Sequence, residues 1–104
     1  MFTILRMALF DEKFNQLEKF EQERILKFQE QLRSFPFVGK PLGFKFFREK
    51  KFNGKRMLYL IYEDLKVVFF ITICDKKSQQ KEIDIIKANF KYYEEIVREI
   101  LNKN

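Results

Sequence analysis

The dipeptide Asn53-Gly54 is the feature that most restricts what this chain can fold into. A tight hairpin turn of the primed type needs positive φ at both central positions, and Asn-Gly adopts them readily. Strand-like sequence lies on both sides, over residues 44–52 and 56–63, so we expect a β-hairpin there. Residues 67–74, VVFFITIC, are β-branched and aromatic without alternation, which predicts a further strand that is buried on both faces.

Helical periodicity lies on either side of this strand-rich middle. Apolar residues recur three or four positions apart from Phe10 to Leu17 and again from Ile25 to Phe35. These two runs form either a helical hairpin with a turn near residues 20–22 or one bent helix. The same spacing from Glu82 to Leu101 predicts one long amphipathic helix, which Ser78 could cap.

The remaining segments complete the predicted fold. Residues 2–7 predict a short strand, and PFVGKPLG at residues 36–43 predicts a loop because it holds both prolines and two of the three glycines. The order is therefore β-α-α-β-β-β-α. We expect an α+β fold in which helices pack on a small, mainly antiparallel sheet of about four strands. The length of 104 residues predicts a single domain over residues 1–104.

The positive charge is concentrated in the middle of the chain. The formal net charge is +6, and residues 36–62 hold seven basic residues against Glu49 alone, so this quarter carries the whole excess. Such a concentration favours an anionic partner, of which nucleic acid is the commonest.

The composition excludes several kinds of chemistry. There is no histidine and only one cysteine, so a Ser-His or Cys-His nucleophile cannot form, and a zinc site would have only carboxylates. We expect neither metal nor cofactor. Cys74 is expected to be a small buried side chain. The sequence shows no signal peptide and no membrane span, so we expect a cytoplasmic protein.

Cationic chemistry remains. Cleavage of RNA needs a base for the 2′-hydroxyl, a proton donor for the leaving oxygen and positive charge around the phosphorane. Crowded lysines can serve where histidine is absent, whereas arginine acts only as a clamp. Lysines on a strand can instead protect an edge from aggregation, and Arg56 can be purely structural. The candidate catalytic residues are Arg56, Lys50, Lys51, Lys76 and Lys77, and the candidate nucleic-acid-binding residues are Lys45, Arg48 and Lys55.

The chain resembles the RelE/ParE superfamily of toxins from type II toxin–antitoxin modules. The resemblance covers nearly the whole chain, in the order FDEKFNQLEKF, SFP, GKPL, GKRMLYLIYED and VVFFITICDKK. Its most specific parts are Arg56-x-x-Tyr59 and Asp75-Lys76-Lys77. The resemblance implies an antitoxin partner and an mRNA endonuclease that acts on the ribosome without a metal.

The resemblance leaves other functions open. Several nucleases of the family place a tyrosine after the last strand, where this chain reads SQQKEID. Either lysines alone transfer the protons, or the chain is not a nuclease. The alternatives are a non-catalytic toxin that acts on DNA gyrase, as the ParE-like branch does, and a non-toxic nucleic-acid-binding module with the same fold.

Overall fold

The computed structural model describes residues 1–103 and has the α+β fold that the sequence predicts. Its elements are β1 (Thr3–Arg6), α1 (Ala8–Asn15), α2 (Lys19–Leu32), β2 (Lys40–Phe44), β3 (Phe47–Phe52), β4 (Lys55–Tyr62), β5 (Val67–Asp75), α3 (Gln79–Ala88) and α4 (Phe90–Asn102). The strands form one sheet in the order β1-β5-β4-β3-β2. Strand β1 runs parallel to β5, and the other neighbouring strands are antiparallel.

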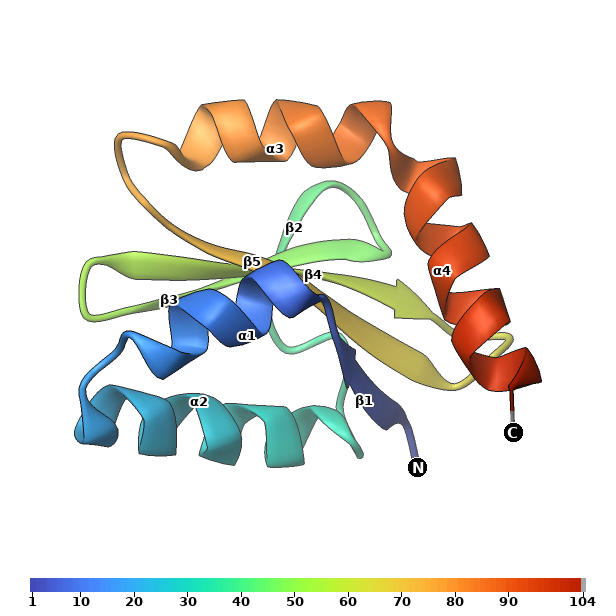
Figure 1. Cartoon of the computed structure of the whole chain (residues 1–104), viewed down its shortest axis with the longest axis horizontal. Helices are drawn as coiled ribbons and strands as arrows, with labels where there is room; N and C mark the ends of the chain where they lie inside the picture. Colours follow the sequence, from blue (N-terminus) through green and yellow to red (C-terminus); the bar gives the residue numbers. More distant parts are fainter. Residues whose placement is uncertain (104) are drawn as a thin grey trace.

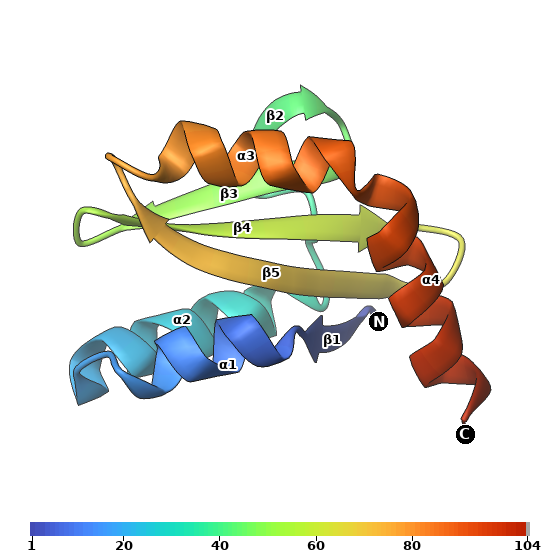
Figure 2. The same ribbon diagram turned by 45° about the horizontal axis from the view of Figure 1, so that its top comes forward.

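Helices cover both faces of the sheet. Helices α1 and α2 lie on one face and α3 on the other, while α4 lies at the end where β4 turns into β5 (Figures 1 and 2). One core holds Phe10, Phe28 and Tyr59, and the other holds Phe47, Leu58 and Ile83, with further residues on each side. No helix within residues 1–103 is both long enough and apolar enough to cross a bilayer.

The predicted hairpin is confirmed. Asn53 has φ 46° and Gly54 has φ 75°, so both turn residues are left-handed, and Phe52 pairs with Lys55 across the turn. The strand predicted at residues 67–74 is also confirmed: it is β5, and every residue from Val67 to Cys74 is buried between the two helical layers. This hairpin fixes the register that places the charged side chains.

The prediction of a loop over residues 36–43 is wrong in its second half. Residues 40–44 form the edge strand β2, and the strand predicted at residues 44–52 is shortened to β3 by a turn at residues 45–46. Pro41 is tolerated because an edge strand needs only one partner. Gly43, with φ 87°, lies where the pairing with β3 becomes irregular. The sheet therefore has five strands within the described residues, not four.

The prediction of one long C-terminal helix is also wrong. Asn89, with φ −130° and ψ 23°, separates α3 from α4, and its side-chain amide donates to the Ile85 carbonyl at 2.7 Å. Asparagine competes in this way with the backbone for a helical acceptor, which ends the helix. At the other end of the chain, the helical hairpin is confirmed, but its turn lies at residues 16–18. The side chain of Glu18 forms a capping box with Glu21, which starts α2 earlier than predicted.

Candidate functional site

Arg56 lies at the end of the sheet where the β3–β4 hairpin turns. It pairs with Lys51 on β3 and with Cys74 on β5. Arg56 is only 9% exposed. Its Nη1 donates to the Gly54 carbonyl at 3.3 Å, but its Nε has no hydrogen-bond partner within residues 1–103. A buried donor without a partner is costly, so this guanidinium is suited to hold an anionic ligand.

The register separates Lys50 from Lys51. Successive residues of a strand point to opposite faces, and Lys51 pairs with Arg56 whereas Lys50 pairs with Met57 of the other core. The Lys50 ammonium lies 5.3 Å from the centre of the Phe28 ring on α2. Lys51 is therefore on the face of Arg56, and Lys50 is on the opposite face.

Glu49 is a residue of this site that the sequence analysis did not select. It lies two positions before Lys51 on the same face of β3, and it is 2% exposed. The side-chain amide of Gln79, in the first turn of α3, donates to Glu49 Oε2 at 2.6 Å. A buried carboxylate thus lies on the same face of the sheet as Arg56, with α3 closing over it.

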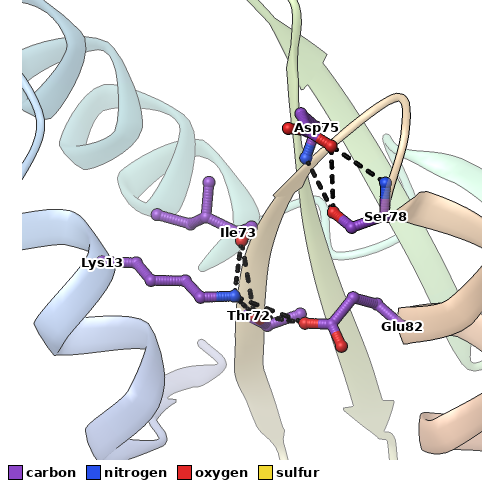
Figure 3. A network of polar contacts seen from close by, with 6 residues as sticks. All are labelled: Lys13, Thr72, Ile73, Asp75, Ser78 and Glu82. Carbon is purple, nitrogen blue, oxygen red and sulfur yellow. Dashed lines mark hydrogen bonds and ion pairs between the residues drawn. The ribbon is translucent and has the colours of Figure 1, made fainter.

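The turn between β5 and α3 carries Lys76 and Lys77, both exposed. Asp75 holds this turn by accepting hydrogen bonds from the Ser78 backbone at 2.9 Å and from its hydroxyl at 3.0 Å (Figure 3). These bonds lower the pKa of the Asp75 carboxyl below its usual value. Ser78 occupies the N-cap position as expected, but its side chain binds Asp75 and does not cap α3.

Lys13 joins three elements beside this turn. Its Nζ donates to Thr72 Oγ1 at 2.7 Å, to the Ile73 carbonyl at 3.0 Å and to Glu82 Oε1 at 3.3 Å, as Figure 3 shows. Pairing with β1 ends at Phe70, so the last part of β5 has a free edge there. We call these four groups the Lys13 network; it ties α1, β5 and α3 together at that edge.

A cavity of about 420 Å³ lies between Lys13, Lys55, Asp75 and Ser78, among others. Its two lysines already have partners, because Lys13 binds Glu82 and Lys55 Nζ lies 2.7 Å from the buried carboxylate of Glu21. This cavity is therefore less suited to an anion than Arg56, whose Nε has no hydrogen-bond partner in the described part of the chain.

The other predicted nucleic-acid-binding residues lie away from Arg56. Arg48 donates to the carbonyls of Lys45, Phe37 and Gly39, which fixes the connection between α2 and β3. The Lys45 ammonium lies 4.8 Å from the centre of the Phe37 ring. The structure therefore groups Lys51, Lys76 and Lys77 at the same end of the sheet as Arg56. Lys45, Arg48 and Lys50 form a separate group around Phe37 and Phe28.

Neither the cysteine nor the tyrosines add a reactive group beside Arg56. Burial raises the pKa of the Cys74 thiol to about 11, so the thiol is protonated at neutral pH. Burial also raises the pKa of Tyr59 to about 12, and its hydroxyl accepts a hydrogen bond from the Gly39 backbone on the opposite face. Tyr92 is exposed on α4, whereas Tyr93 packs in the core.

The comparisons with known proteins identify the fold. No protein-family model matches the sequence, and no curated protein matches it. The isolated RelE toxin of E. coli superimposes with a TM-score of 0.65 at 16% identity, over 83% of this chain and 99% of RelE. A chain of the intact E. coli RelBE toxin–antitoxin complex gives 0.66 at 18%, over 72% and 96%. A RelBE complex of Mycobacterium tuberculosis gives 0.62 at 19%, over 72% and 98%. This chain has the RelE fold.

Proposed function

We propose that this chain, built on the RelE fold, is the toxin of a toxin–antitoxin module and cleaves mRNA on the ribosome. The observation that carries the proposal is the buried Arg56, whose Nε has no partner within the described residues, at the basic end of the sheet. Several structures that share the fold are RelE–RelB complexes, which supports an antitoxin as the partner of this chain. An acidic segment of the antitoxin would complement the positive charge of the β3–β4 hairpin.

The proposed chemistry uses the face of the sheet that holds Arg56. The ribose 2′-oxygen attacks the adjacent phosphorus, and the bond from phosphorus to the 5′-oxygen breaks. Glu49 accepts the 2′-hydroxyl proton, Lys51 donates a proton to the leaving 5′-oxygen, and Arg56 binds the phosphorane charge. Lys76 and Lys77, which are exposed, bind neighbouring phosphates.

This assignment differs from the sequence-based one in the proton acceptor. Lysine carries a proton at neutral pH unless its pKa is depressed, so it accepts one poorly. Glu49 is a carboxylate and lies on the correct face, whereas Lys50 lies on the other. RNA reaches Glu49 only after the hydrogen bond from Gln79 breaks and the first turn of α3 moves aside. Removing that amide with Gln79→Ala is expected to open the site.

Controlled expression in a bacterial host, with transcript 5′ ends mapped shortly after induction, tests the proposal. New ends inside translated codons are expected with the wild-type chain and not with Arg56→Ala. Arg24→Ala is the matched control, because Arg24 is exposed on α2, on the other side of the sheet; it should retain the cuts. Cuts that persist in folded Arg56→Ala would contradict the proposed role of this residue.

A second candidate function starts from the closed state of the site. Arg56 and Glu49 are both buried, Gln79 of α3 binds Glu49, and within residues 1–103 no tyrosine follows β5 before Tyr92. A non-catalytic toxin that acts on DNA gyrase needs no open nuclease site. In that case induction would produce a DNA-damage response with mRNA left intact. Absence of both growth arrest and cuts would instead favour a non-toxic nucleic-acid-binding module.

A further inference from the structure

The turn of the β3–β4 hairpin has a chemical property that the proposed function does not use. Asn53 and Gly54 are both exposed there, at one end of the sheet (Figures 1 and 2). The side-chain amide of an asparagine is attacked by the backbone nitrogen of the next residue, and the attack is fastest before glycine, which has no side chain to hinder it. Larger residues follow Asn15, Asn89 and Asn102. The dipeptide that sets the hairpin therefore also holds the most reactive of these amides.

The Gly54 nitrogen is free to attack. Its N–H has no hydrogen-bond partner within residues 1–103, so no bond has to break before the nitrogen loses its proton. The space beside its α-carbon is also open, because no atom from outside residues 53–55 lies within 4 Å of the place where a side chain would begin. Water and hydroxide therefore have access to this peptide group.

The Asn53 side chain has a structural task at this turn. Its Nδ2 donates to Glu21 Oε2 at 2.8 Å, and Lys55 Nζ donates to the same oxygen at 2.7 Å. The Glu21 side chain is only 5% exposed, and it lies in the first turn of α2. Loss of the Asn53 amide would therefore remove a donor from a buried carboxylate that ties α2 to the hairpin.

We propose that Asn53 is a site of spontaneous deamidation. Hydroxide removes the proton of the Gly54 amide, and the nitrogen attacks Cγ of Asn53. The bond from Cγ to Nδ2 breaks, and the amide takes a proton from water and leaves as ammonia. Water then adds to either carbonyl of the cyclic imide and opens it to aspartate or to isoaspartate. The net change consumes a water molecule and releases ammonia, so no other reactant is needed.

The isoaspartyl product changes the hairpin itself. Its main chain runs through the former side chain, which adds a carbon atom to the two-residue turn. Turn geometry sets the register of a hairpin, and the register here pairs Lys51 with Arg56. This product therefore loses the alignment of the two cations at the candidate site. The modification does not depend on the proposed nuclease activity.

The aspartyl product keeps the turn, because Asp-Gly also suits a primed turn. It places a second carboxylate where Asn53 Nδ2 donated to Glu21, so two like charges share the ammonium of Lys55. The pairing of Lys51 with Arg56 is retained, whereas the contact between the hairpin and α2 is weakened. The two products thus differ in which part of the structure they disturb.

Peptide mapping by mass spectrometry tests the modification. The purified whole chain is incubated at mildly alkaline pH until a sample unfolded in guanidinium has deamidated at Asn53. The folded chain is expected to show, in the peptide that holds Asn53, the mass gain for replacing NH by O. The peptide that holds Asn15, which is exposed but precedes Gln16, is the internal control and should not change. An unmodified Asn53 in the folded chain, or an equal gain at Asn15, would overturn the proposal.

Nuclear magnetic resonance of the two products, separated by ion exchange, tests the structural consequences. Cross-strand nuclear Overhauser effects between Lys51 and Arg56 are expected in the aspartyl form and not in the isoaspartyl form. Their presence in both forms would contradict the loss of register.

The variant Asn53→Asp isolates the effect of the second carboxylate. Glu21→Gln is expected to lower the urea midpoint less in the Asn53→Asp chain than in the wild type, because it then also removes a repulsion. An equal or larger decrease would contradict the contact between the two carboxylates. The spectra of each variant report whether it is folded.

Discussion

Replacing Lys13 with methionine is expected to destabilise the chain by about 2–3 kcal/mol. The substitution removes the ammonium from the Lys13 network, which leaves the Ile73 carbonyl with only the long 3.4 Å hydrogen bond from the Thr72 hydroxyl and leaves Glu82 without its cation. The side chains of Lys13 and Glu82 are 34% and 19% exposed. The expected loss therefore lies below the 3–5 kcal/mol of a fully buried pair and above the ~0–1 kcal/mol of an exposed one.

Urea unfolding followed by circular dichroism measures this loss. A loss of unfolding free energy of this size also lowers the melting temperature of a domain of this length by about 10 °C. A double-mutant cycle with Glu82→Gln should give a coupling energy of about 1 kcal/mol, because the two groups share a hydrogen bond. Lys27→Met, an equivalent change on the exposed side of α2, is the control and should cost under about 0.5 kcal/mol.

The outcome decides whether the network is structural. A loss under about 0.5 kcal/mol for Lys13→Met, or a coupling energy indistinguishable from zero, would contradict a stabilising role for the Lys13 network. It would mean that solvent replaces the ammonium at the free edge of β5 without cost. The position of α3 over Glu49 would then depend on apolar packing and on the hydrogen bond from Gln79 to Glu49.

Three further predictions concern the face that each lysine of β3 occupies, the hydrogen bond of Tyr59 and the pKa of Glu21. In the expression assay, Lys51→Ala should abolish the mRNA cuts and Lys50→Ala should retain them; the reverse would contradict the assigned faces. Tyr59→Phe leaves the buried Gly39 N–H without its acceptor and should cost about 1–3 kcal/mol in urea unfolding, where an unchanged midpoint would contradict the bond. Hydrogen bonds from Lys55 and Asn53 lower the pKa of Glu21 from its usual 4.5, so Glu21 contributes stability at neutral pH that is lost as the pH falls below about 4.5. Glu21→Gln should flatten this acid limb of a stability–pH curve, and an unchanged slope would contradict the shift.

Local sequence patterns predict much of the fold. Asn53-Gly54 determines the hairpin, and the unbroken apolar run from Val67 to Cys74 identifies the central strand. Strand β2 is missed because an edge strand buries little, so its residues show no apolar alternation, and its proline and glycine read as a loop. The break at Asn89 is missed because the apolar spacing continues through it into α4.

The site is less predictable because it depends on which face each side chain occupies. Alternation along β3 already separates Lys50 from Lys51, a signal that the sequence analysis does not use. Glu49 is overlooked because a single acidic residue among the basic residues of a strand has the pattern of an exposed surface residue. The role of Lys13 depends on where pairing between β1 and β5 ends, which no local pattern reveals.

The most direct test of the proposed nuclease activity uses purified chain, ribosomes and an mRNA, with primer extension to detect cuts. We expect cleavage by the wild-type chain, loss of the cut when the ribose at that position lacks its 2′-hydroxyl, and loss of cleavage with Arg56→Ala. Intact mRNA with the wild-type chain would contradict the proposed nuclease activity, and equal cleavage by a folded Arg56→Ala variant would contradict the proposed role of Arg56.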